Sequence, residues 1–227
     1  MGCLCRQGGR AMNRMISKKP EHETIYRRVK DMILFGEVVP GQSLTIHGLA
    51  EMIETGITPA REAIRRLTAE GALETLENRR VTVPEMTSQK LDQIELVRLA
   101  AEPQLARLAT RYCDKTAISE LEEIDTVINA AIVNGDIRSY LEANYRFHFT
   151  LYRLADAAIL MDIADGLWLR VGPSLRVVCG RFGTSQLVDH HQEATAALRE
   201  GNAEKAGLAL AEDIRQGIAF VRQTLLP

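Results

Sequence analysis

The sequence lacks several features that would place the protein in a specialised class. No apolar run approaches the roughly 20 residues that a membrane span requires, and the first residues lack the apolar core of a signal peptide. The four cysteines, Cys3, Cys5, Cys113 and Cys179, form no CxxC pair, so neither a zinc ribbon nor a disulfide framework is indicated. No internal repeat or low-complexity tract is present. We therefore expect a soluble cytoplasmic protein without a membrane partner.

Charge divides the chain into two parts of opposite sign. Residues 1–83 contain 13 Lys and Arg against 10 Asp and Glu, whereas the remainder contains 15 against 20. The 227 residues, of which 46% are hydrophobic, suffice for one large domain or two small ones. A basic front and an acidic rear favour two domains with separate roles. The positive excess is too small to indicate a nucleic-acid partner by itself.

Residues 21–83 have the element order of a winged helix-turn-helix domain. Helical periodicity predicts helices at 23–35 and 46–53, separated by a Gly/Pro turn over 36–44, and a third helix from 58. Two short strands are expected at 73–76 and 81–83, around a charged turn. In this plan the third helix enters the DNA major groove N-terminus first.

The third helix, TPAREAIRRLTAEG, has an apolar side and a basic side. The apolar stripe has helical spacing and consists of Ala60, Ala63, Ile64 and Leu67. Thr58 is the predicted N-cap, and Arg61 and Arg65 project from another face. An ordinary surface helix would share this pattern, but the elements around it favour a helix whose arginines contact DNA.

The segments FGEVVPGQSLTIHGLAEMI and TPAREAIRRLTAEGALE resemble the DNA-binding domain of GntR-type transcriptional regulators. The resemblance implies that Thr58, Arg61 and Arg65 contact double-stranded operator DNA.

Two positions depart from the pattern of that family. Ile57 occupies the place of an arginine at the start of the third helix, and Arg80 occupies the place of a glycine in the wing. Loss of a base-reading arginine costs about 1–3 kcal/mol of discrimination, so we expect an altered operator, with Arg79 and Arg80 adding minor-groove or phosphate contacts. The same departures leave open a ligand sensor that does not bind DNA.

The rest of the chain is predicted to be helical. Residues 1–20 are expected to be a flexible arm, and 84–88 a linker to a domain at 89–227. Helices are expected at 89–112, 116–134, 137–155, 158–180, 184–200 and 203–225. The predicted fold class is therefore mainly α, with an N-terminal winged helix-turn-helix domain and a C-terminal all-helical bundle.

Polar groups occupy inward positions on three of these helices. Asn144 and His148 share one inward sector, His191 points inward while His190 turns toward solvent, and Asp213 lies on an apolar side. A lone inward histidine is usually a satisfied core residue. Together, however, Asn144, His148, His191 and Asp213 offer a donor set that suits Zn²⁺, Ni²⁺ or Mn²⁺. A hydrogen-bonded polar cavity without metal is the alternative.

The bundle resembles the FCD effector domain of one branch of GntR regulators, which has a metal site of the pattern D-x-x-x-H, H-x-x-I-x-x-A-L-x-x-G-D and a final histidine. Here NYRFH supplies Asn144 and His148, and HQEATAALREGN supplies His191. Asp213 stands where the final histidine is usual, so two of the four ligands are replaced by other oxygen donors.

Arg98 lies on the inward side of the first bundle helix and requires an anion. The resemblance implies that it binds the carboxylate of a small effector, with Asn144 assisting; an internal salt bridge to Glu102 is the alternative. Together these features predict a homodimeric, metabolite-responsive transcriptional regulator and not an enzyme. A metalloenzyme remains a second hypothesis. The absence of a separate general base or nucleophile near these residues argues against it.

Overall fold

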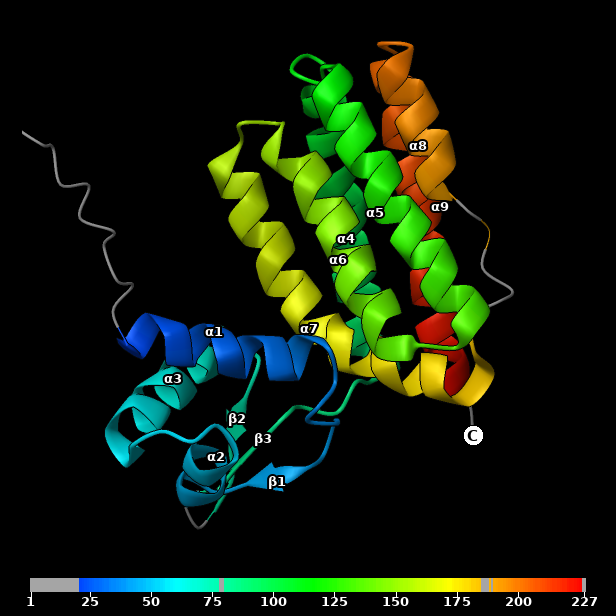
Figure 1. The fold of residues 1–227 in the computed structure, drawn as a ribbon. Helices are drawn as coiled ribbons and strands as arrows, with labels where there is room; N and C mark the ends of the chain where they lie inside the picture. The colour runs from blue at the N-terminus through cyan, green and yellow to red at the C-terminus, as the bar shows by residue number, and fades with distance from the viewer. Residues whose placement is uncertain (1–20, 78–79, 185–187, 189, 226–227) are drawn as a thin grey trace, which may run out of the picture.

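The computed structural model describes residues 21–77, 80–184, 188 and 190–225, and these form two parts (Figure 1). The N-terminal part comprises α1 (Glu21–Leu34), β1 (Ser43–Leu44), α2 (Ile46–Met52), α3 (Ile57–Ala69), β2 (Glu74–Thr75) and β3 (Val81–Thr82). The C-terminal part comprises α4 (Ser88–Ala109), α5 (Lys115–Asn134), α6 (Ile137–Arg153), α7 (Ala158–Phe182), α8 (His190–Arg199) and α9 (Ala203–Arg222), then a 3-10 turn at Gln223–Leu225. The predicted mainly α fold, a winged helix-turn-helix followed by a helical bundle, is confirmed. In the part of the chain that is described, no helix has the length and apolarity to cross a bilayer.

The sheet of the N-terminal part, which we call the wing, contains one strand more than the two that the sequence predicts, namely β1. Strand β3 lies in the centre of an antiparallel sheet of order β1-β3-β2, in which Val81 pairs with both Leu44 and Thr75. The expected Gly/Pro turn over 36–44 therefore ends in strand β1. Leu44 is buried there. Its pairing with β3 depends on a segment almost 40 residues away, so the local sequence pattern around residue 44 could not predict the strand.

Helix α3 packs as predicted but begins earlier. Its apolar stripe, Ala60, Ala63, Ile64 and Leu67, is buried. The prediction of Thr58 as N-cap is wrong, because the helix starts at Ile57 and Gly56 holds the extended N-cap conformation without a side-chain bond. Pro59 still lies in the first turn, where its missing N–H has no intrahelical partner to lose.

The predicted helix at 184–200 begins too early. Helix α7 continues to Phe182 and ends at Gly183, whose φ of +73° favours glycine. Thr184 and Val188 are not helical, and the side chain of Gln216 binds both the N–H and the C=O of Val188, at 2.8 and 3.1 Å. Helix α8 starts at His190. The remaining residues of that segment, 185–187 and 189, and the predicted arm at 1–20 lie outside the described residues.

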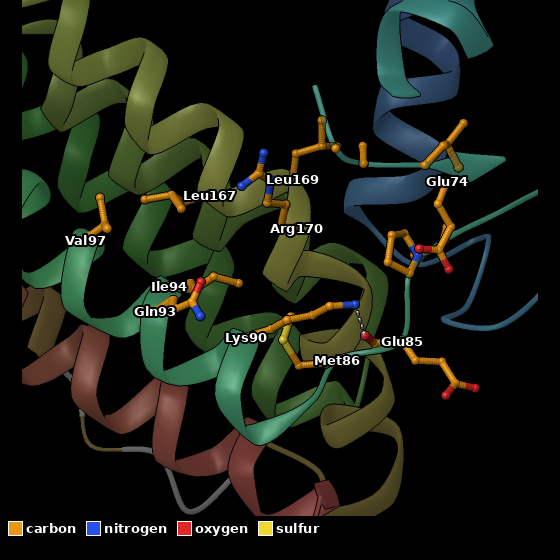
Figure 2. Close-up of a pocket in the computed structure, with 15 residues that line it drawn as sticks. Glu74, Glu85, Met86, Lys90, Gln93, Ile94, Val97, Leu167, Leu169 and Arg170 are labelled. Carbon is orange, nitrogen blue, oxygen red and sulfur yellow. Dashed lines mark hydrogen bonds between the residues drawn. The ribbon is translucent and has the colours of Figure 1, made fainter. Parts of the chain in front are cut away.

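The wing and the bundle face each other across a cavity of about 420 Å³ (Figure 2). Residues of the wing and of helices α4 and α7 line it. Lys90 of α4 donates to the carbonyl of Glu85 at 3.0 Å, and Arg170 of α7 donates to the carbonyl of Glu70 at 3.1 Å. Glu85 lies in the linker, so it is the Arg170 bond that joins the two parts beside this open space.

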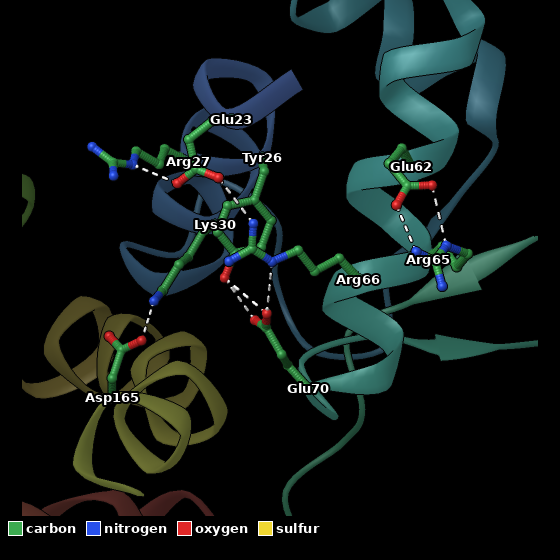
Figure 3. Close-up of polar contacts among 9 residues, drawn as sticks. All are labelled: Glu23, Tyr26, Arg27, Lys30, Glu62, Arg65, Arg66, Glu70 and Asp165. Atoms are coloured by element: carbon green, nitrogen blue, oxygen red, sulfur yellow. Dashed lines mark hydrogen bonds and ion pairs between the residues drawn. The ribbon is translucent and has the colours of Figure 1, made fainter. Parts of the chain in front are cut away.

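The other side of the junction, between α1 and α7, is close-packed. A Cβ atom at position 172 would lie 2.5 Å from the carbonyl oxygen of Leu34, so only Gly172 permits this approach. Nearby, Lys30 of α1 forms an ion pair with Asp165 of α7 (Figure 3). The hydroxyl of Tyr145 on α6 donates to the same carboxylate at 2.9 Å. Helix α1 is thus the main structural connection between the two parts.

Candidate functional site

The exposed face of α3 carries the three residues predicted to contact DNA. Thr58, Arg61 and Arg65 are all exposed. Arg65 pairs with Glu62 at 2.6 Å, and its side chain remains 73% exposed (Figure 3). Exposed pairs of this kind contribute little, so Arg65 can exchange Glu62 for a phosphate at small cost.

Arg66 has a structural role on the same helix. Its guanidinium pairs with Glu23 at 2.9 Å and Glu70 at 3.2 Å, and lies 3.5 Å from the ring centroid of Tyr26. The hydroxyl of Tyr26 also donates to Glu70 at 2.8 Å (Figure 3). These contacts join α3 to α1 and fix the direction in which Arg61 and Arg65 point.

The wing places Arg80 on the surface, where its carbonyl accepts from the N–H of Leu76 at 2.8 Å. Arg79 lies outside the described residues. Ile57 is half-buried at the start of α3.

Inside the bundle, three predicted metal ligands converge from α6, α8 and α9. His148 Nε2 lies 3.2 Å from Asp213 Oδ2 and 3.4 Å from His191 Nε2. His191 Nε2 lies 3.7 Å from Asp213 Oδ1. One ligand atom from each residue falls within 4.8 Å of the others. The helical periodicity correctly identified these three side chains as inward-facing.

The chemistry of this cluster fits a divalent metal. Two imidazole nitrogens and a carboxylate form a donor set of the kind that binds Zn²⁺, Ni²⁺ or Mn²⁺, with positions left for a ligand. His148 is wholly buried and burial lowers its pKa, although Asp213 opposes this shift, so its ring favours the neutral form that binds metal. Burial would raise the pKa of Asp213, but His148, His191 and Arg98 outweigh it and hold that pKa below its ordinary value.

Asn144 and Arg98 lie beside this cluster and share a small cavity with Asp213. The cavity has a volume of about 30 Å³ and is lined by Tyr140 and Trp168, among others. Asn144 is buried and lines this cavity together with Arg98 and Asp213.

Arg98 makes the internal salt bridge that the sequence offered as its alternative role. Nε and Nη2 donate to the two oxygens of Glu102 at 2.6 and 3.0 Å, with both side chains buried. Burial alone would lower the pKa of Arg98, but Glu102 raises it above the ordinary value. Within the described part of the chain, the hydrogen bonds of the Arg98 guanidinium come from Nε and Nη2.

His190 does not join the cluster. It pairs with Glu193 at 2.9 Å, and its side chain is only 15% exposed, so it is turned away from the site but is not fully in solvent.

Sequence reasoning missed the residues behind the two histidines. Tyr152 Oη lies 3.0 Å from His148 Nδ1, and Asp125 Oδ1 lies 3.5 Å from His191 Nδ1. Asp125 follows Ile124 on the buried side of α5, so the signal that revealed Asp213, a carboxylate among apolar positions, was present there too. Tyr152 gave no such signal, because a tyrosine on an apolar face is an ordinary core residue.

Comparisons with known proteins agree with this architecture. The model of the family described as bacterial regulatory proteins, gntR family, matches residues 21–83, and that of the FCD domain matches 93–216. The HTH-type transcriptional regulator McbR of Escherichia coli is 30% identical over 198 residues, which cover 86% of this chain and 90% of McbR. A probable D-xylose utilization operon transcriptional repressor of Paenarthrobacter nicotinovorans is 26% identical over 87% of this chain and 89% of its own length. The solved structure of E. coli McbR/YncC superposes with a TM-score of 0.85 at 28% identity, covering 90% of this chain and 98% of that one.

Proposed function

This chain belongs to the GntR family of bacterial transcriptional regulators, in the branch with an FCD domain, and from that premise we propose that it is a metabolite-responsive, DNA-binding regulator. In this proposal the winged helix binds operator DNA and the bundle binds a small organic acid through a divalent metal. The relatives compared above are transcriptional regulators, and the family is not one of enzymes.

The operator contacts are assigned to one end and one side of α3. Thr58 and Arg61 lie in its first turns and Arg65 one turn further on, all on the surface that does not pack against the domain core. In winged helix domains this end of the helix meets base edges and phosphates. Arg79 and Arg80 are assigned to the wing contacts, on the basis of their place in the sequence between β2 and β3.

The observation that carries the metal proposal is the convergence of His148, His191 and Asp213 in the bundle interior. The bound cation would supply positive charge to hold an effector carboxylate. Asn144 and Arg98 border the same cavity as Asp213, and this supports assigning them to the remaining carboxylate oxygen.

The volume of the cavity limits how the acid enters. A cavity of about 30 Å³ holds roughly two water molecules, so an organic acid requires its walls to move. Helices α4, α6, α7 and α9 supply these walls. Helix α6 also carries Tyr145 and helix α7 carries Asp165, and both residues lie at the contact with Lys30 of α1. If the acid binds only when these walls have moved, it would favour the arrangement of the DNA-binding domain that goes with the moved walls. Such a difference in binding between two arrangements is what a population shift requires.

A homodimer is proposed from the apolar side chains on two helices that pack together, α4 and α7. Leu96 and Val97 on α4 are 72% and 40% exposed, and Ile159 and Ile163 on α7 are 78% and 40% exposed. Exposed apolar side chains of this size are candidates for a protein interface, and a two-fold dimer would place two α3 helices on successive half-sites.

The proposal is tested by selecting DNA from a random pool at low salt and by elemental analysis after incubation with excess Zn²⁺, Ni²⁺ and Mn²⁺. We expect one enriched sequence and about one equivalent of metal. Failure to enrich any sequence favours the pure sensor, and less than about a tenth of an equivalent of metal favours a hydrogen-bonded pocket that holds its ligand directly.

A further inference from the structure

The back of the His148 ring is held by a chain of buried hydrogen bonds. His148 Nδ1 lies 3.0 Å from the Tyr152 hydroxyl, and this hydroxyl lies 2.6 Å from Glu102 Oε2. All three residues are 0% exposed. No solvent rearrangement therefore interferes with the direction of these bonds.

The Glu102 carboxylate decides where the Tyr152 proton points. It also accepts two bonds from Arg98 and one from Trp168 Nε1 at 3.0 Å. An ionised carboxylate only accepts, so Tyr152 donates to it. The Tyr152 oxygen is then the acceptor for a proton on His148 Nδ1, which leaves a lone pair on Nε2.

His191 has a carboxylate behind its ring as well. Its Nδ1 lies 3.5 Å from Asp125 Oδ1, a buried oxygen without a hydrogen-bond partner among the described residues. The other oxygen, Oδ2, accepts from Asn129 at 3.2 Å. A proton on His191 Nδ1 satisfies Oδ1 after a small shift, and Nε2 again keeps its lone pair.

We propose that Tyr152, oriented by Glu102, and Asp125 are positioning residues that set both imidazoles in the Nδ1–H tautomer. Both Nε2 lone pairs then face Asp213 across the cluster. Two lone pairs and a carboxylate at such distances repel one another, and a cation among them removes that cost. This inference rests on the metal site proposed above, but the tautomers of the two histidines can be measured in the metal-free protein.

The first test measures the tautomers directly. Histidine ring ¹⁵N shifts are recorded for metal-free full-length protein at about pH 8, above the ordinary imidazole pKa of about 6.5. We expect Nδ1–H for both histidines in the parent, a shift of His148 toward Nε2–H in Tyr152→Phe, and a shift of His191 in Asp125→Asn. The control Tyr145→Phe removes a hydroxyl from the same helix and should change neither. Nε2–H rings in the parent, or tautomers unaltered in both variants, would overturn the inference.

The second test measures Zn²⁺ affinity by competition with a chromophoric chelator. Tyr152→Phe and Asp125→Asn should each weaken binding about 10–100-fold, as loss of an outer partner of a metal-bound histidine does. Tyr145→Phe and Glu122→Gln, an exposed change on α5, should stay within about twofold of the parent. Equal affinity in all variants refutes the positioning role. If the parent binds no Zn²⁺, the proposed metal site fails instead, and the tautomer measurement alone decides this inference.

Discussion

The buried Arg98–Glu102 pair makes a strong prediction about stability. Glu102→Gln keeps the size of the side chain but removes its charge, leaving the guanidinium of Arg98 without a counterion. The Arg98 and Glu102 side chains are 4% and 0% exposed, so solvent does not replace the lost charge.

The magnitude follows from the burial and from the number of bonds that Glu102 accepts. Breaking a buried ion pair by removing one partner costs about 3–5 kcal/mol. The amide also turns an N–H₂ group toward part of a ring of donors, Arg98, Tyr152 and Trp168, that need acceptors. We expect the upper part of that range.

Urea unfolding followed by circular dichroism measures this loss. With a slope of about 2 kcal/mol per molar, the midpoint should fall by about 2 M. The matched control is Glu142→Gln on α6, whose pair with Arg138 joins side chains that are 44% and 55% exposed. That change should cost less than about 1 kcal/mol. Both variants are measured at one protein concentration, because dimerisation adds to stability.

An equal, small shift of the midpoint in both variants would refute the reasoning. It would mean that Glu102 does not hold the charge of Arg98 in solution. Arg98→Ala should likewise lose stability as well as effector response, because it leaves Glu102 buried without its cation.

The remaining predictions concern the two sites. Arg61→Ala should weaken operator binding without loss of fold, and parent affinity should fall steeply with salt in a fluorescence titration; a flat salt response would exclude phosphate contacts. Ile57→Arg should tighten or shift the preferred operator by up to about 3 kcal/mol at one position, and identical selected sites would place residue 57 away from the bases. His191→Ala should abolish metal binding while His190→Ala retains it, as measured by elemental analysis. Metal affinity should fall only below about pH 6, because burial lowers the pKa of His148 and the neutral ring persists as pH drops; a loss of metal already at pH 7 would contradict this.

Much of the recognition helix and of the candidate metal cluster was determined by local sequence. The stripe of Ala60, Ala63, Ile64 and Leu67 has a period that only one face of a helix can satisfy, so the exposed side of α3 followed directly. The same argument turned His148, His191 and Asp213 inward. Each conclusion needed only the period of one helix and the cost of burying a polar group.

Tertiary structure decided everything that depends on the separation between elements. Whether Glu102 of α4 meets Tyr152 of α6, whether Asp125 stands behind His191, and whether Ser43 and Leu44 find β3 as a partner depend on distances between residues on separate segments. Helical period gives the direction of a side chain around the axis of its own helix. It gives neither the rotation of the neighbouring helix about that helix's axis nor its position along the bundle. Those are fixed only when all the apolar faces pack together at once, and a shift of an ångström there decides between a hydrogen bond and none.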